Sequence, residues 1–224
     1  MLSDEEKRIL YLILEANCVT SIGMLQPYLK MSRTSIGRLL YSLEKKGFVK
    51  RFRIKDETYA KIVPTQVTNL RVMFRIKAPI LYIGLLGLPR PEYPEPVTLT
   101  SLKLLEDAEI RILDVIVTTS REALKKQVHA LEEATAKKGL KITYLLVSPD
   151  DYNDCFNKIK EAVEERILKY NIVCDVTGGT KIMTLALAKI AHEYCLPMMY
   201  VYLEKMKLVK LNIEGWRAIH NARP

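Results

Sequence analysis

The sequence is poor in residues that bind metals or form cross-links, and it has no long apolar segment. Its 224 residues include four cysteines and three histidines, and no two cysteines form a C-x-x-C pair. Zinc and redox sites usually need such a pair or closely spaced histidines, so we expect reduced thiols, no metal and no cofactor. No apolar run reaches the roughly 18 residues that span a bilayer, and no signal-peptide pattern opens the chain. We therefore expect a cytoplasmic protein without a membrane partner.

Charge is abundant but unevenly distributed along the chain. Residues 1–63 contain 12 Lys and Arg against 7 Asp and Glu, a net of +5, whereas residues 80–224 contain 20 against 19. A basic segment next to a nearly neutral one favours a nucleic-acid-binding domain attached to a regulatory domain, although a basic face can also serve only solubility. We therefore expect two domains, residues 1–63 and 80–224, joined by a linker at 64–79. Part of that linker alternates apolar and basic residues and can add an edge strand or pack between the domains.

The first domain is predicted to consist of three short helices followed by a hairpin. The first helix begins after Ser3, with three acidic residues in its first turn, where the helix dipole favours them. The second begins at Thr20 or Ser21, and the third begins after Ser32 and ends at Lys45-Lys46-Gly47. Two strand-like runs, 48–54 and 59–63, then flank a polar turn at 55–58, which predicts a hairpin.

This order of elements, with L-E-K-K-G-F-V leading into a basic hairpin, resembles the winged helix-turn-helix family of DNA-binding domains. The resemblance implies that the third helix enters the major groove of double-stranded DNA and that the hairpin contacts its backbone. A winged helix that serves only protein contacts is the alternative. The contacts that the resemblance implies, to bases from the helix and to phosphates from the hairpin, involve Arg33, Thr34, Ser35, Arg38, Lys50, Arg51, Arg53 and Lys55.

From residue 80 onward, strand patterns alternate with helix patterns. Continuously apolar runs predict buried strands at 80–86, 112–118, 141–147, 171–175 and 197–203. Helices are predicted between them at 98–107, 121–138, 151–169 and 180–195, and a last, antiparallel strand is predicted near 207–213. This alternation indicates an α/β fold with a Rossmann-like, doubly wound and mostly parallel sheet. Such sheets bind ligands beyond the carboxyl ends of their strands, where the strand order reverses.

The turn between the fourth strand and its helix carries the strongest chemical signal in the chain. Gly178 and Gly179 leave the backbone N–H groups open to a ligand, and a helix begins immediately afterwards with its positive dipole end. Thr177, Thr180 and Lys181 add hydroxyl groups and a positive charge, so the turn suits phosphate. The spacing matches neither a P-loop nor a G-x-G-x-x-G fingerprint. A tight connection capped by Thr180 is the alternative.

The motif D-x-T-G-G-T-K-x-M at residues 175–183 resembles the second signature motif of CARF domains, the CRISPR-associated Rossmann-like sensors of cyclic oligoadenylates. The resemblance covers about residues 79–215, although many CARF domains have a hydroxyl residue where Leu88 stands here. It implies a homodimer that binds a cyclic oligoadenylate, with cyclic tetra-adenylate as the expected ligand. The ligand-binding residues that it implies are Gly87, Arg90, Thr118, Thr119, Ser120, Thr177, Gly178, Gly179, Thr180, Lys181 and Met183.

Both resemblances together imply a ligand-responsive, DNA-binding transcription regulator of a CRISPR-Cas system. One alternative is a metal-independent ring nuclease that cleaves the cyclic oligoadenylate, with Lys181 stabilising the developing charge. Another is a sensor of NAD or a different nucleotide. We expect Asp175 to fix the turn by accepting backbone N–H bonds. Because no histidine and no other carboxylate lies near the turn in the sequence, we predict sensing over cleavage.

Overall fold

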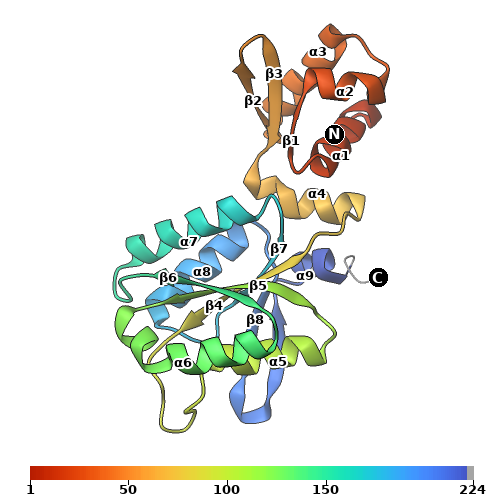
Figure 1. Ribbon diagram of the computed structural model, residues 1–224. Coiled ribbons are helices and arrows are strands. Elements are labelled where there is room, and N and C mark those ends of the chain that lie inside the picture. Colours follow the sequence, from red (N-terminus) through yellow and green to blue (C-terminus); the bar gives the residue numbers. More distant parts are fainter. Residues whose placement is uncertain (221–224) are drawn as a thin grey trace. The chain divides into compact units, whose positions relative to one another are not determined.

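The computed structural model describes residues 1–220, and the chain divides into two compact units, Met1–Arg75 and Ile76–Pro224. The first unit contains the three helices and the hairpin that the sequence predicts (Figure 1). Ser3, Ser21 and Ser32 cap the three helices, each accepting a hydrogen bond from a backbone N–H of the first turn. These elements are α1 (Asp4–Glu15), α2 (Ile22–Leu29), α3 (Arg33–Lys45), β2 (Val49–Ile54) and β3 (Glu57–Ile62).

Two elements of the first unit escaped the sequence prediction. The short strand β1 (Val19–Ser21) pairs antiparallel with β3 and completes a three-stranded sheet in the order β1-β3-β2. The predicted edge strand within residues 64–79 is wrong, because a short 3-10 turn, Pro64–Gln66, leads into helix α4 (Val67–Phe74). Val67, Leu70 and Arg71 are buried, which is the i, i+3, i+4 spacing of a helix face.

A buried carboxylate ties α1 to α3 in the first unit. Glu6 is 2% exposed, and its two carboxylate oxygens lie 2.6 and 2.7 Å from Nζ of Lys46. The hydroxyl of Ser42 and the backbone N–H of Ser3 also donate to this carboxylate, at 2.7 and 2.8 Å. Burial alone would raise the pKa of Glu6, but these hydrogen bonds outweigh it and lower the pKa to about 2.

The second unit is built on a six-stranded sheet in the order β6-β5-β4-β7-β8-β9. Its first five strands are parallel, and β9 pairs antiparallel with β8, as predicted. The strands are β4 (Ile80–Leu86), β5 (Ile112–Thr119), β6 (Lys141–Leu146), β7 (Asn171–Asp175), β8 (Met198–Tyr202) and β9 (Lys207–Leu211). The helices are α5 (Val97–Asp107), α6 (Arg121–Lys137), α7 (Tyr152–Arg166), α8 (Lys181–Glu193) and α9 (Ile213–His220). A 3-10 turn, Leu203–Lys205, separates β8 from β9.

The last helix, α9, corrects the prediction that a strand extends to residue 213. Strand β9 ends at Leu211, and the chain then becomes helical. Trp216 and Ile219 are each 1% exposed and lie one helical turn apart on the buried side of α9. The indole N–H of Trp216 donates to the carbonyl oxygens of Met198 and Leu211, both at 3.0 Å, so the ring holds the helix against the end of the sheet.

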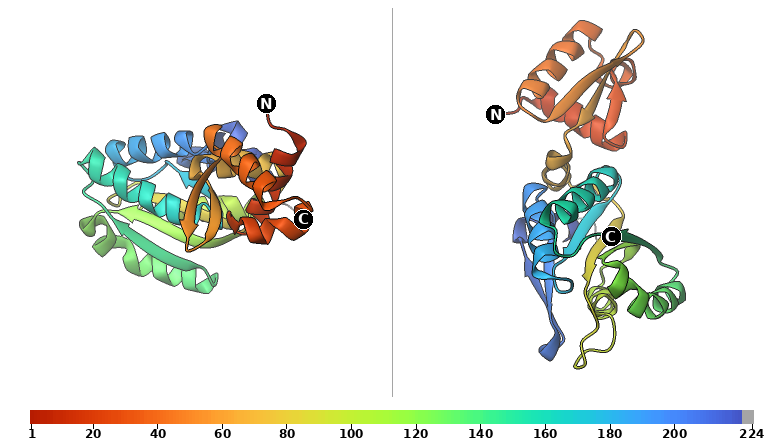
Figure 2. Two further views of the ribbon diagram at one scale, coloured as in Figure 1. Left: turned by 90° about the horizontal axis from the view of Figure 1, so that it is seen from above. Right: turned by 90° about the vertical axis from the view of Figure 1, so that its left-hand side faces the viewer.

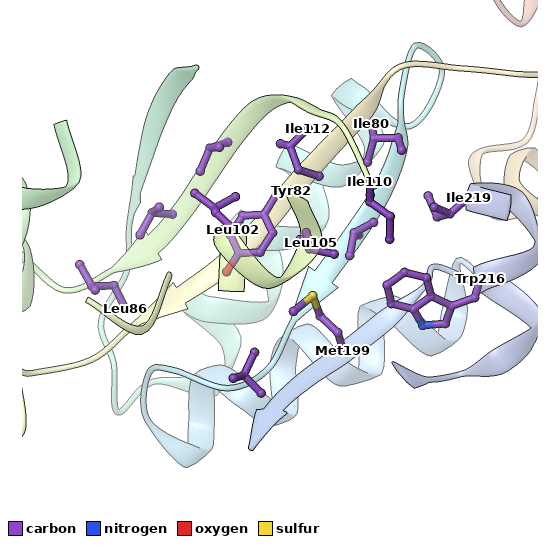
Figure 3. Packing of buried hydrophobic residues seen from close by; sticks show 14 of the residues in the cluster. Ile80, Tyr82, Leu86, Leu102, Leu105, Ile110, Ile112, Met199, Trp216 and Ile219 are labelled. Atoms are coloured by element: carbon purple, nitrogen blue, oxygen red, sulfur yellow. The ribbon is translucent and has the colours of Figure 1, made fainter. Parts of the chain in front are cut away.

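Helices cover both faces of this sheet (Figure 2). Helices α7 and α8 pack together on one face, and α5 and α6 lie on the other. One hydrophobic cluster fills the layer beneath α5 and α9, where Tyr82 and Met199 of the sheet meet Leu105 and Trp216 of the helices (Figure 3). Helices therefore cover both faces of the sheet, and the ends of the strands are left as the place for a ligand site.

The strand order reverses between β4 and β7, the two central strands. From β4 the chain proceeds through β5 to β6 at one edge, and it then returns through α7 to β7 on the other side of β4. Strands β4 and β7 pair in parallel register from Ile80 with Asn171 to Gly84 with Asp175, so their carboxyl ends lie side by side. This edge is the position at which doubly wound sheets bind ligands.

Candidate functional site

The turns that follow β4 and β7 are in direct backbone contact. A Cβ atom at Gly87 would lie 3.3 Å from both the Cα and the N of Gly179, and a Cβ at Gly178 would lie only 2.0 Å from the carbonyl oxygen of Leu85. Gly179 also adopts a positive φ of 75°, which other residues rarely adopt. The glycines are therefore required by the close approach of two chain segments as well as by the turn itself.

Asp175, the last residue of β7, fixes the turn that follows this strand. Its Oδ1 accepts hydrogen bonds from the backbone N–H of Thr177, at 2.9 Å, and from the hydroxyl of the same residue. The Thr177 oxygen in turn accepts the backbone N–H of Val201 at 2.7 Å, which ties the turn to β8. Asp175 is 1% exposed, so its carboxylate is a structural part of the turn. This arrangement confirms the prediction that Asp175 accepts a backbone N–H bond of the turn.

Tyr82 holds the second oxygen of this carboxylate. Its hydroxyl donates to Oδ2 of Asp175 at 2.6 Å within the core. A Cβ atom at Gly84 would come within 2.5 Å of the Tyr82 ring and hydroxyl, so only glycine at that position lets the ring lie along the strand. Burial, and then the neighbouring Asp175, raises the pKa of Tyr82 well above its ordinary value of 10.0. The hydroxyl therefore stays protonated and remains a donor.

A cavity of about 320 Å³ opens above these two turns. Its walls combine backbone from the turns with apolar side chains from the strand ends and with polar side chains from the loop that follows β4. The residues that line it are Leu85, Leu86, Gly87, Leu88, Pro89, Arg90, Tyr93, Glu95, Val97, Gln127, Thr177, Gly178, Gly179, Thr180 and Leu203. Thr180 caps α8 by accepting the N–H of Met183 at 3.3 Å, and the first N–H groups of that helix face the same end of the sheet. The site therefore offers an anion-binding edge and an apolar wall.

Six of the eleven predicted ligand-binding residues line this cavity: Gly87, Arg90, Thr177, Gly178, Gly179 and Thr180. Thr118 and Thr119 are fully buried, and the Thr119 hydroxyl donates to the carbonyl oxygen of Leu86 at 3.2 Å. The Ser120 hydroxyl caps α6 by accepting the N–H of Ala123 at 3.2 Å.

The last two predicted residues lie at the start of α8. Met183 is 1% exposed and packs beneath Gly179. Lys181 is exposed at the first position of the helix, next to Thr180 at the cavity wall. Lys181 itself is therefore beside the cavity and not among the residues that line it.

Three polar residues of the cavity were not predicted from the sequence: Tyr93, Glu95 and Gln127. Tyr93 and Glu95 belong to the loop between β4 and α5, residues 87–96, which contains four prolines. No periodic pattern in this loop predicts the direction of a side chain. Gln127 is 6% exposed and belongs to the buried stripe of α6 that also contains Ala123, Leu131 and Thr135. An amide on an otherwise buried helical stripe was the available signal, because buried polar groups need a specific partner.

The predicted DNA-binding residues all lie in the first unit, but they differ in their partners. Nη2 of Arg33 lies 2.6 Å from a carboxylate oxygen of Glu57, and Nε of Arg51 lies 2.8 Å from Glu44. The side chain of Arg51 also lies over the ring of Tyr41. The remaining residues, Thr34, Arg38, Lys50, Arg53 and Lys55, are exposed, and Ser35 is half-buried.

Within residues 1–220, no group of three or more His, Cys, Asp or Glu side chains is arranged to hold a metal ion. None of the helices in the same range is both long and apolar enough to cross a membrane.

The strand order and the glycine-rich turn at the strand reversal define a Rossmann-like domain with an anion-binding edge. Residues 98–218, more than half of the chain, match the family described as the Card1 CARF domain. The chain therefore belongs to the CARF family. No curated protein matches the sequence.

Three solved structures resemble part of the chain. Can2 from Sulfobacillus thermosulfidooxidans in complex with cyclic tetra-adenylate is 24% identical, with a TM-score of 0.49 over 59% of this chain and 35% of that one. Protein VC1899 from Vibrio cholerae is 13% identical, with a TM-score of 0.49 over 61% of this chain and 34% of that one. Enterococcus italicus Csm6 bound to cyclic hexa-2′-fluoro-hexa-dAMP is 10% identical, with a TM-score of 0.46 over 65% and 39%. The chain thus covers between about a third and two fifths of these proteins.

Proposed function

We propose that the second unit binds a cyclic oligoadenylate, with cyclic tetra-adenylate as the expected ring, in the cavity at the ends of β4 and β7. The observation that carries this proposal is the close approach of the Gly87 and Gly179 backbones at the strand reversal, where both residues line the cavity. Backbone N–H groups and a helix start bind phosphate oxygens without any need for a metal. Membership of the CARF family supports this choice of ligand.

The size of the cavity supports a homodimer. A volume of about 320 Å³ lies at the low end for small-molecule sites and accommodates only part of a four-nucleotide ring. A ring of identical units presents the same groups on opposite sides, so a two-fold symmetric pair of chains can grip it with two copies of the same turn. In that arrangement Lys181, next to the cavity wall, reaches a phosphate on the far side of Thr180.

For the first unit, we propose a winged helix-turn-helix that binds double-stranded DNA, with residues 1–63 as this domain and 64–79 as the connection. Support comes from its three helices, its antiparallel hairpin and its net charge of +5. Arg38 on α3 is exposed and can reach bases, while Lys50, Arg53 and Lys55 of the hairpin suit phosphates. The Glu57 and Glu44 carboxylates hold Arg33 and Arg51 in fixed positions at the edge of this surface.

The two activities together make a ligand-responsive transcription regulator. A ring that binds one arrangement of the dimer more tightly than another shifts the population toward it and thereby changes DNA affinity. The test is calorimetry on the full chain with cyclic tri-, tetra- and hexa-adenylate, followed by duplex binding with and without the ring. Absence of binding by all three rings would remove the proposal.

A ring nuclease is the second candidate, and the specific observation in its favour is Glu95. This carboxylate lines the cavity, whereas Asp175 is buried and fully engaged. A general base can assist attack by a ribose 2′-OH on its neighbouring phosphate, and such assistance contributes about 10²–10⁴-fold. We nevertheless expect the ring to persist over minutes with equimolar protein. Chromatography that shows conversion to linear di-adenylate, abolished by Glu95→Gln, would favour the nuclease.

A further inference from the structure

Gln127 is a buried polar side chain in the wall of the proposed ligand cavity. It reaches the cavity from α6, and it is 6% exposed. Its Nε2 lies 2.6 Å from the carbonyl oxygen of Gly87. Gly87 is in close backbone contact with Gly179, so the amide is attached where the two turns meet.

The chemistry of this hydrogen bond fixes the orientation of the amide. A backbone carbonyl can only accept, so the group that faces Gly87 must be the NH₂ of Gln127. The Oε1 atom therefore points away from Gly87, and no residue within 1–220 donates a hydrogen bond to it. Gln127 lines the cavity, and this oxygen is not among the fully enclosed side-chain atoms without a partner in the part of the chain that the structure describes, so it offers the cavity an atom that can only accept.

The rest of the cavity wall divides into two kinds of surface. The glycine turn and the start of α8 supply donors that suit phosphate. The wall that includes Val97, Leu203 and Tyr93 is apolar and aromatic, and such a surface suits the flat face of a base. Glu95, which lines the same cavity, adds a second group that accepts when ionised.

We propose that Gln127 determines base specificity by selecting a ligand whose base carries an amino group, as adenine does at its 6-position. The inference rests on the proposed function, because it assigns a base subsite within the same cavity. Adenine donates its amino hydrogen to Oε1. In the same pose, a 6-oxo purine places an acceptor instead of a donor against Oε1, and this mismatch is expected to cost about 10- to 100-fold in affinity.

The experiment compares two rings that differ at the 6-position of the base, cyclic tetra-adenylate and cyclic tetra-inosinate, by calorimetry on the full chain. The protein is expected to prefer the adenine ring by about 10- to 100-fold. Gln127→Met keeps the length of the side chain but removes the acceptor, so the preference is expected to fall below about threefold. Lys126→Met, on the adjacent exposed position of α6, is the matched control and is expected to retain the full preference.

The outcomes separate this inference from the proposed function. If the protein binds neither ring, the proposed function fails. If it binds both rings equally, or if Gln127→Met keeps the preference, the inference about Gln127 is overturned while ring binding stands. If Gln127→Met loses its fold, a third ring decides with the unaltered protein. This third ring is a cyclic tetranucleotide of unsubstituted purine, which has neither an amine nor an oxygen at the 6-position. Its affinity is expected to lie between those of the adenine and hypoxanthine rings. Any other order of affinities overturns the inference.

Discussion

Tyr82 and Asp175 join the two central strands of the sheet across 93 positions of sequence, through a hydrogen bond of 2.6 Å from the tyrosine hydroxyl to Oδ2. Oδ1 of the same carboxylate accepts the backbone N–H of Thr177. The Tyr82 hydroxyl therefore helps to position the glycine-rich turn at residues 177–180 through one intermediate residue, Asp175. The hydrophobic core and the binding edge are thus parts of one structure, and the position of the turn depends on core residues.

Tyr82→Phe removes the hydroxyl that donates to Asp175 and keeps the aromatic ring. Oδ2 of the buried Asp175 carboxylate then lacks its donor, so the free energy of unfolding is expected to fall by about 1–3 kcal/mol. Tyr202→Phe is the matched control, because the Tyr202 hydroxyl bonds to Glu204 at the surface, 2.8 Å away. Urea unfolding of each variant measures the difference, and equal losses in the two would contradict a special role for Tyr82.

Gly178→Ala places a methyl group 2.0 Å from the carbonyl oxygen of Leu85. The turn must shift, which is expected to cost about 1–3 kcal/mol of stability and to abolish ring binding. Gly37→Ala in α3 is the control, since its Cβ would meet only the Cδ1 of Ile22 at an ordinary 3.8 Å. That change is expected to stabilise by about 0.5–1 kcal/mol. An unaltered ring affinity in Gly178→Ala would move the site away from this turn.

Lys181→Ala tests whether the ligand extends past the cavity of one chain. Loss of a charged hydrogen bond is expected to weaken cyclic tetra-adenylate binding by about 1.5–3 kcal/mol. Lys189→Ala, two turns further along α8, removes the same charge from an exposed position that pairs with Glu193 and is expected to have no effect. Calorimetry on the full chain gives both values. If the two variants bind the ring with equal affinity, Lys181 contributes only through the overall positive charge of the protein and not through a contact with the ligand.

The hairpin cations are expected to differ in their contribution to DNA binding. Arg53→Ala should lower duplex affinity for all sequences and reduce the slope of affinity against salt by about one unit. Arg51→Ala should have a smaller effect, because Glu44 already neutralises Arg51 at 2.8 Å. Lys126→Ala in the second unit serves as the control for overall charge. Anisotropy titrations at several salt concentrations measure these slopes, and a larger effect for Arg51 than for Arg53 would refute the assignment.

Glu6 makes the stability of the first unit depend on pH. Its pKa of about 2 is lower than the ordinary 4.5, so the stabilisation is fully present above pH 4.5 and is lost as the pH falls toward 2. Glu6→Gln is expected to lower the free energy of unfolding by about 1.5–3 kcal/mol at pH 7, and the difference should shrink in acid. Denaturant unfolding at pH 7, 4 and 2.5 tests this. A difference that stays constant with pH would exclude the Lys46 pair as its source.

Much of the second unit could be predicted from local patterns. The parallel strands bury both faces, so their apolar runs are continuous, and each predicted strand was found within a few residues. Helix starts were equally readable where a hydroxyl side chain accepts an N–H of the first turn, as at Ser32, Ser120 and Thr180. Short elements repeat a period too few times to be predicted, which is why β1, α4 and α9 were missed or assigned wrongly.

The sequence by itself determined where the glycine-rich turn lies, because glycines, hydroxyls and a helix start are adjacent in the chain and their chemistry is local. Only the tertiary structure decided which other residues share that site. Gln127 and Glu95 are separated from the turn by about 50 and 80 positions, and they meet it because the strand order reverses between β4 and β7. Thr118 and Thr119 lie at a strand end as predicted, yet close packing buries them completely. Periodicity reports whether a residue is buried, whereas the partner it is buried against depends on how distant strands pair.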